Sequence, residues 1–161
     1  MDLITDRTLE NVAARDALGT YNTGDLNRVE SAAEELSGQM QGLEAELRDY
    51  AGAQGVAWQD AFLPEYEARE AAVSVRKDWT MEDMPTARQM RRYLGNIQKL
   101  SGLLEVPLDG FPETMENLSF QGANAIEAAL LACEARFRQV RADKINMIDQ
   151  AAEAQKEDSD G

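Results

Sequence analysis

The chain has 161 residues, a length that suits one domain whose hydrophobic core needs neither disulfides nor metals. Its formal net charge of −14 argues against sequence-independent binding to nucleic acid through a broad basic face. There is no run of about 18 apolar residues, and the first residues lack the basic-then-apolar order of a signal peptide. We therefore expect no membrane segment and no leader.

The N-terminal part of the chain predicts a short helix and then a long one. The N-cap oxygens of residues Thr5 to Thr8 favour a helix near residues 6–17. Thr23 caps the next helix, which should run to about Tyr50. Spacings of three and four gather its apolar residues into one stripe: Leu26, Val29, Ala33, Leu36, Met40, Leu43 and Leu47. Two glycines in this helix indicate local bending or the close approach of a neighbour: Gly38 and Gly42.

The middle of the chain is less regular. Residues 51–55 indicate a linker. The next segment has aromatic residues spaced by four, as on a helix, but Pro64 would interrupt a helix there: Trp58, Phe62 and Tyr66. Val73–Lys77 alternates like a short strand, although a lone strand has no ladder partner. Residues 56–79 are therefore left open between helix and strand.

Two more long helices follow. Thr86 and Gln89 have capping-box spacing at the start of a helix that should reach about Leu104, with the stripe Met90, Tyr93, Ile97, Leu100 and Leu104. Residues 105–118 form a crossover with one helical turn at Glu113–Asn117. Ser119 caps the last helix, which should end near Ala152 and carries the stripe Ala123, Ile126, Leu130, Cys133, Phe137 and Val140.

These elements predict an all-α fold, a helical bundle of three long amphipathic helices plus one or two short ones. We expect a single helical-bundle domain over residues 1–152. Residues 153–161 should be a mobile acidic tail, because they carry no large apolar side chain to bury.

A short internal similarity links the starts of two long helices. The segment from Asp25 to Glu30 aligns with that from Gly122 to Glu127, matching an asparagine, a β-branched residue and a glutamate in register. Either a duplication or a shared way of bonding a neighbouring helix or loop would explain the match.

Side chains for catalysis are scarce. The chain has no histidine, which removes the usual general base, Ser-His and Cys-His pairs and most zinc sites. The one cysteine, Cys133, lies in an apolar stripe and is expected to be a core residue. No phosphate-cradling glycine loop occurs, and close carboxylate pairs are expected by chance among 30 acidic residues. We therefore expect no catalytic residue, no cofactor, no metal site and no enzymatic activity.

One basic island interrupts the acidic surface and is the candidate partner surface. It comprises Trp79, Arg88, Arg91 and Arg92, with Arg76, Lys77 and Lys99 nearby. The basic residues either pair with carboxylates of neighbouring helices or bind a partner. Trp79 either closes the end of the bundle or, if exposed, anchors that partner.

The negative charge is concentrated in the first half of the chain. Residues 1–70 have a net charge of −10 and residues 71–161 a net charge of −4. This half is either a solvated helix surface or a surface that docks a basic partner or imitates a nucleic-acid backbone. On a helical wheel the carboxylates of residues 30–49 spread over much of the polar arc, which favours solvation.

Four segments together resemble a known module: Ile4–Thr8, Tyr21–Glu30, Asp78–Thr86 leading to Arg92–Asn96, and Pro112–Glu127. In order and spacing they are similar, over roughly residues 4–135, to a helical module of virion proteins from phages and prophages of gut Firmicutes, associated with the tail or baseplate. The resemblance implies a non-enzymatic structural or adaptor subunit of a phage particle. It implies other virion proteins as partners and a homo-oligomer, without direct contact to nucleic acid or membrane.

The alternative function is an acidic phage-encoded inhibitor. Such a protein would present carboxylates in place of phosphates and block a host nucleic-acid-binding protein. A virion subunit is assembled in the host cytoplasm and found in particles, whereas an inhibitor is absent from particles.

Overall fold

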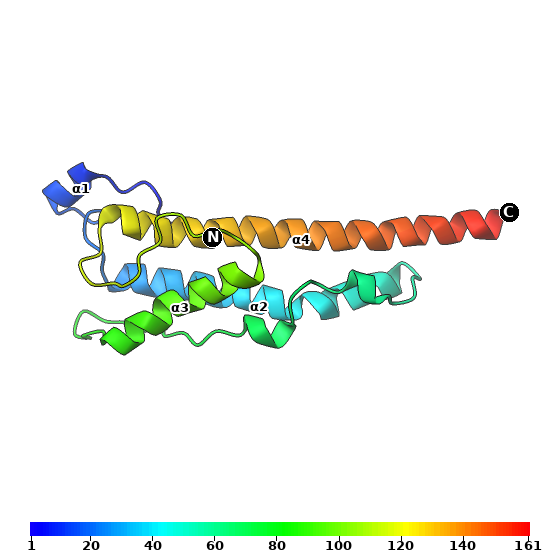
Figure 1. Cartoon of the computed structure of the whole chain (residues 1–161), viewed down its shortest axis with the longest axis horizontal. Coiled ribbons are helices and arrows are strands. Elements are labelled where there is room, and N and C mark those ends of the chain that lie inside the picture. Colours follow the sequence, from blue (N-terminus) through cyan, green and yellow to red (C-terminus); the bar gives the residue numbers. More distant parts are fainter.

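The computed structural model describes all 161 residues and contains four α-helices, two 3-10 turns and no strand (Figure 1). The protein is therefore all-α, as predicted. The α-helices are α1 (Leu9–Ala14), α2 (Thr23–Ala53), α3 (Ala87–Leu103) and α4 (Phe120–Asp160). The 3-10 turns are η1 (Asp60–Phe62) and η2 (Ala68–Ala71). No helix is both long and apolar enough to cross a membrane.

The helices α2, α3 and α4 all run in the same direction (Figure 1). Arg28 and Glu127 near the starts of α2 and α4 are bonded, as are Tyr50 and Asp149 near the far end of α2, and both pairs are 99 positions apart. A constant separation requires a parallel alignment. Helices α2 and α3 are each followed by a segment that returns the chain to the same end.

The residues predicted to lie in the core are buried there. Leu36, Ile97 and Leu130, one from the middle of each stripe, are each 0% exposed, so this part of the prediction is confirmed. The stripes of α2, α3 and α4 meet in one continuous hydrophobic cluster. Phe62 from η1 and Ala71 from η2 add to it, which seals the side where the chain returns from the end of α2.

Residues 72–79, which we call the strap, lie extended against α2 and α3. Neither a helix nor a strand, the two alternatives that the sequence left open, forms at Val73–Lys77, because helix side chains bond this backbone in place of a ladder. Asn96 Nδ2 of α3 donates to the Ser74 carbonyl at 2.7 Å, and Lys99 Nζ donates to the Ala72 carbonyl at 2.8 Å. At the start of the strap, Ser37 Oγ of α2 donates to the Ala71 carbonyl at 2.7 Å.

The aromatic residues before the strap do not share a helix. Phe62 is buried in η1, and the Trp58 ring meets it edge-on with 5.6 Å between ring centroids. The Arg48 guanidinium stacks 4.2 Å from the centroid of Trp58. Tyr66 donates its hydroxyl hydrogen to the Met40 carbonyl at 3.0 Å. Pro64 separates η1 from η2, as its lack of an N–H predicts.

Two of the three long helices begin as predicted. Thr86 and Gln89 form the capping box of α3, and Ser119 Oγ accepts from the Gly122 N–H at 3.0 Å at the start of α4. The cap of α2 is Asn22 rather than Thr23, because the Asn22 side chain accepts from the Gly24 N–H at 2.8 Å.

Several helix boundaries differ from the prediction. Helix α1 is shorter than residues 6–17, because Arg15 adopts a left-handed φ of 52° and ends it. No helical turn forms at Glu113–Asn117, and Asn117 also has a positive φ of 53°. Helix α4 continues to Asp160, past its last buried residue, Ala152. Its final turns are exposed, and their mobility stays a prediction.

Of the two alternatives for the glycines of α2, local bending or close approach of a neighbour, the structure excludes the close approach, which leads to a prediction. A Cβ added at Gly38 or Gly42 would meet no atom within 4 Å. Gly38→Ala should therefore raise the free energy of unfolding by about 1 kcal/mol, through helix propensity alone. Leu36→Ala, two residues away and fully buried, should lower it by roughly 2–5 kcal/mol.

Urea denaturation of both variants measures these changes. Gly55→Ala serves as a control, because Gly55 has a φ of +69° and alanine there is strained. A loss of stability in Gly38→Ala would mean that a neighbour contacts this face of α2.

Candidate functional site

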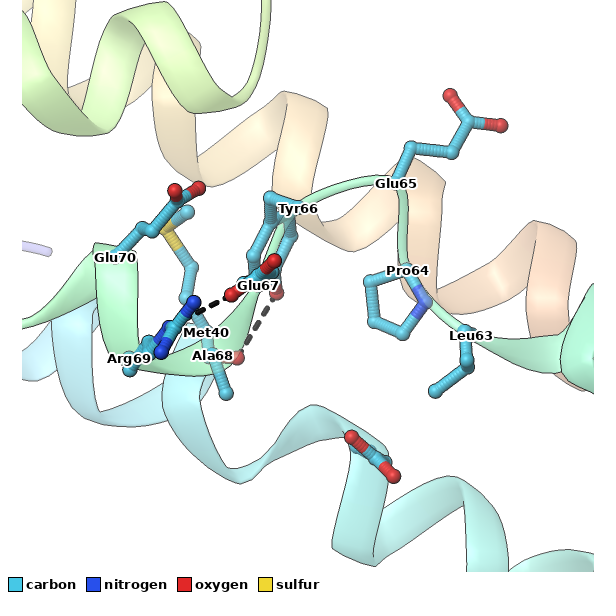
Figure 2. A pocket seen from close by; sticks show the side chains of 10 residues that line it. Met40, Leu63, Pro64, Glu65, Tyr66, Glu67, Ala68, Arg69 and Glu70 are labelled. Atoms are coloured by element: carbon cyan, nitrogen blue, oxygen red, sulfur yellow. Dashed lines mark hydrogen bonds and ion pairs between the residues drawn. The ribbon is translucent and has the colours of Figure 1, made fainter.

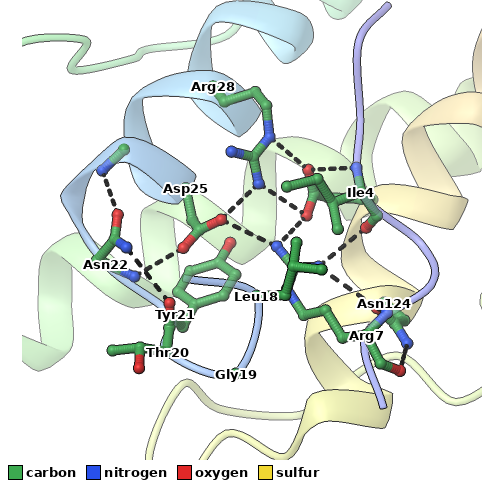
Figure 3. A network of polar contacts seen from close by, with 12 residues as sticks. Ile4, Arg7, Leu18, Gly19, Thr20, Tyr21, Asn22, Asp25, Arg28 and Asn124 are labelled. Atoms are coloured by element: carbon green, nitrogen blue, oxygen red, sulfur yellow. Dashed lines mark hydrogen bonds and ion pairs between the residues drawn. The ribbon is translucent and has the colours of Figure 1, made fainter. Parts of the chain in front are cut away.

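The polar residues of the interior gather where α2, α3 and α4 begin. Figure 3 shows the larger group, in which the N-terminal segment crosses the first turns of α2 and α4. Arg7 is 4% exposed, Asp25 4% and Glu127 0%. Charged side chains this deeply buried are tolerated only when they are paired and hydrogen-bonded.

Two residues of α4 hold Arg7, and we call this arrangement the first clasp. Asn124 bonds both backbone groups of Arg7: its Oδ1 accepts from the N–H at 3.1 Å and its Nδ2 donates to the carbonyl at 2.9 Å. One helical turn later, Glu127 Oε2 lies 2.6 Å from Arg7 Nη2. Backbone and side chain of the same residue are thus fixed from one helix face.

Charges from α2 complete the first clasp. Arg28 Nε donates to Glu127 Oε1 at 2.8 Å, and Arg7 Nη2 donates to Asp25 Oδ1 at 2.9 Å. Burial by itself lowers the pKa of Arg28, but the hydrogen bonds to Glu127 and Asp25 outweigh it and raise that pKa. Two guanidinium groups therefore balance two carboxylates, and the cluster has no net charge.

A second clasp holds Trp79 at the end of the strap in the same way. Asn27 Oδ1 accepts from the Trp79 N–H at 2.8 Å, and Asn27 Nδ2 donates to the Trp79 carbonyl at 3.0 Å. One turn later, Glu30 Oε2 accepts from the indole Nε1–H at 2.6 Å. Arg92 of α3 supplies the positive charge, with Nη2 at 2.7 Å from Glu30 Oε1.

The clasped residues themselves stand in matching contexts. The sequences are Asp6-Arg7-Thr8 and Asp78-Trp79-Thr80. The backbone N–H of Thr8 donates to Asn11 Oδ1 at 2.8 Å, and that of Thr80 donates to Asp83 Oδ2 at 2.7 Å. The internal similarity noted in the sequence is therefore a shared way of bonding a loop, in which an Asn-x-x-Glu face holds one residue of an extended segment.

Two tyrosines lie between the clasps. The hydroxyls of Tyr21 and Tyr93 are hydrogen-bonded to each other, and the Arg7 guanidinium stands 5.5 Å from the centroid of the Tyr21 ring. Burial raises the pKa of both phenols, that of Tyr93 well above its ordinary value. Both tyrosines are therefore neutral near pH 7 and cannot act as bases there.

The structure disperses the residues of the predicted partner surface. Trp79 is 4% exposed, so it closes the bundle end and cannot anchor a partner. Arg92 belongs to the second clasp, because Glu30 lies within reach of α3. Arg76 stacks on the Trp79 ring, with Cζ 4.1 Å from the centroid, and pairs with Asp83. Arg88 and Arg91 are exposed and outside any ion pair, and the nearby Lys99 is exposed but bonded to the Ala72 carbonyl.

Sequence reasoning missed the roles of Arg7, Asp25 and Arg28. Their positions resemble ordinary helix-end charges. Only the packing of the N-terminal segment, α2 and α4 reveals that Arg7 and Asp25 are buried and that Arg28 is partly buried. The repeated order of aspartate, clasped residue and threonine, with one Asn-x-x-Glu for each, is the sequence signal that was available.

The largest surface hollow lies far from the clasps. It measures about 730 Å³ and is formed by Met40 and Glu44 of α2 together with residues 63–70 (Figure 2). Its rim is acidic, and its one cation, Arg69, pairs with Glu67 at 2.7 Å. No group of three or more Cys, Asp or Glu side chains is placed to hold a metal ion. The absence of a metal and a cofactor stays a prediction for elemental analysis and spectroscopy.

Comparison of the chain with protein-family models, with curated proteins and with solved structures yields no match.

The clasps give a prediction with a matched control. Asn27→Ala and Asn124→Ala each remove two hydrogen bonds to one backbone residue and should lower the free energy of unfolding by about 1–3 kcal/mol. Asn146→Ala, on the exposed face of α4, should not lower it, because it removes no hydrogen bond to another segment and alanine has the higher helix propensity. Equal denaturation midpoints for Asn124→Ala and Asn146→Ala would show that the clasp bonds do not stabilise the fold.

A second prediction concerns the thiol. Burial raises the pKa of Cys133 to about 11, and its side chain is 0% exposed. At pH 8 it should therefore react with Ellman's reagent far more slowly than a free thiol, at a rate limited by opening of the bundle. The same chain in urea should react at once, and fast reaction of the native protein would contradict the burial of α4 at this position.

Proposed function

We propose that this chain is a non-enzymatic structural or adaptor subunit of a phage particle, within its tail or baseplate. Its partners would be other virion proteins and further copies of itself. It would be assembled in the cytoplasm of the host bacterium and reside in the virion. The three long amphipathic helices would act as a rigid body, with short helix α1 at its docking end.

The observation that carries this proposal is the position of the exposed apolar side chains. The large hydrophobic residues that remain exposed are Leu9 at 68%, Val12 at 39%, Met81 at 82% and Met84 at 90%. All of them lie in segments next to the first turns of the long helices (Figure 1). Exposed apolar residues gathered at one end are typical of a surface that binds another protein.

The segments that carry the resemblance to virion proteins support the same reading. Ile4–Thr8, Tyr21–Glu30, Asp78–Asn96 and Pro112–Glu127 meet at this end of the bundle, and both clasps are built from them. The resembling residues are thus those that fix the geometry of the end where α1 and the exposed methionines lie. Proteins that have the same docking end would be expected to have the same residues fixing its geometry.

The carboxylates of the acidic half favour this role over nucleic-acid mimicry. Asp25 and Glu30 are buried in the clasps. Further along α2, Glu34 pairs with Lys77, Glu44 with Arg48 and Glu46 with Arg141. Carboxylates neutralised in this way do not form the continuous unpaired row that would replace phosphates.

Mass spectrometry of purified particles from a producing strain tests the proposal. The chain should be present in repeated copies per particle, in a fixed ratio to other virion proteins across independent preparations. Its absence from particles would overturn the structural role.

A binding assay tests the alternative separately. We expect no competition between the purified chain and DNA for a basic nuclease at low salt. Tight binding of the chain to the nuclease that weakens steeply with added salt would favour the inhibitor over the structural subunit.

A further inference from the structure

The exposed apolar side chains form two separate pairs on different segments. Leu9 and Val12 lie on α1, whereas Met81 and Met84 lie in the loop between the strap and α3. Figure 1 places α1 and this loop on opposite sides of the same end of the bundle. The two pairs therefore cannot cover each other within one chain.

The pair on α1 belongs to a hollow, which we call the α1 hollow. It measures about 400 Å³ and lies between α1 and the first turn of α4, with a mostly apolar lining that includes Leu9, Val12, Leu18, Leu118 and Phe120. Helix α1 buries none of its own residues against the core. An apolar hollow flanked by an uncovered helix is suited to receive an apolar side chain.

Arg7 adds an unused hydrogen-bond donor to this hollow. Arg7 lines the hollow and is 4% exposed, yet its Nε–H has no acceptor. Its charge is already balanced by Asp25 and Glu127. A neutral acceptor such as a backbone carbonyl suits this donor better than a further carboxylate.

The methionine pair is presented by a loop that is fixed in shape. The Thr80 N–H and hydroxyl both donate to Asp83 Oδ2, at 2.7 and 3.0 Å, and Arg76 Nη2 lies 2.9 Å from Asp83 Oδ1. These contacts, the Thr80 N–H first, lower the pKa of Asp83 and keep it ionised. Trp79 on one side is held by the second clasp. Two flexible, polarisable side chains thus project from a rigid support.

The unpaired charges beside the two pairs are complementary. Arg88 and Arg91 follow the methionines on the first turns of α3 and form no ion pair. Beside the α1 hollow, Asp6 and Glu10 are exposed and form no ion pair. Glu82 between the methionines would bring a like charge towards Asp6 and Glu10. Three further exposed charges form no ion pair: Glu113 and Glu116 share a pocket with Arg91, and Arg15 ends α1.

We infer that the Met81–Met84 loop of one copy docks into the α1 hollow of a second copy. The methionine side chains fill the apolar hollow, a backbone carbonyl of the loop accepts from Arg7 Nε–H, and Arg88 or Arg91 approaches Asp6 or Glu10. The two halves of the contact differ, so repetition about an axis builds a closed ring when the rotation closes. This inference rests on the proposed function in one respect, that several copies of the chain occur together in one assembly.

The molar mass of the purified full chain tests the contact. Light scattering and sedimentation at about 100 µM should give a mass above that of the monomer. Met84→Asp and Leu9→Glu change exposed residues, so they should keep the circular dichroism spectrum and weaken self-association by at least about tenfold. Glu82→Gln should strengthen it. A monomeric wild type, or variants that assemble as well as wild type, would overturn the inference.

Mixing two variants separates this contact from others. Met81→Asp/Met84→Asp keeps an intact hollow, and Leu9→Glu/Val12→Glu keeps an intact loop. Each variant alone should be monomeric, whereas the mixture should form a one-to-one complex. No larger assembly should form, because the complex uses the one intact hollow and the one intact loop that the two variants supply. A mixture that stays monomeric would overturn the contact. A monomeric chain that is nevertheless found in purified particles would refute this contact while leaving the proposed function intact.

Discussion

Three long helices that run in the same direction require extended return segments, and the backbone of those segments must be hydrogen-bonded without a sheet. This constraint shapes the rest of the molecule. The returning strap is bonded by Asn96 and Lys99 of α3, and Ser37 of α2 bonds the last residue of η2 directly before the strap. Where the strap and the N-terminal segment cross the first turns of the helices, an asparagine bonds both backbone groups of one residue. Side chains of the helices thus supply the backbone hydrogen bonds that a neighbouring strand supplies in a sheet.

The clasps also determine which side chains remain exposed at this end of the bundle. Each uses a buried glutamate to hold the side chain of the residue whose backbone is already fixed, Arg7 in one case and Trp79 in the other. Trp79, for which the sequence left open a role in closing the bundle end or in anchoring a partner, is buried in this way. What is left exposed lies beyond the clasped residues, in α1 after Arg7 and in the methionine loop after Trp79. The two halves of the proposed docking contact are therefore presented by equivalent structures.

The sequence predicted the parts of the fold that depend on local periodicity. The stripe positions Leu36, Ile97 and Leu130 are buried because a spacing of three and four fixes which helix face is apolar. Periodicity does not fix the direction in which helices pack, so the parallel arrangement was not foreseen. The alternation at Val73–Lys77 does mark an extended backbone, but it could not show that its partners are side chains. Arg7 was missed because its burial arises from contacts 18 and 117 positions away, beyond the reach of local pattern.

Buried ion pairs contribute little net stability against an apolar alternative, because removing their charges from water offsets the attraction. Their use here is better explained by register. Sliding α4 by one turn along α2 would move Glu127 by about 5.4 Å from Arg28, so the buried carboxylate would lose this partner while Arg28 kept only Asp25. An apolar interface would tolerate such a shift at a smaller cost, since one methyl group can replace another. Because Glu127 also holds Arg7, the register of the helices and the position of α1 are set by the same carboxylate. A rigid spacing between the α1 hollow and the methionine loop follows, and a repeated contact between copies needs such a spacing in order to close into a ring.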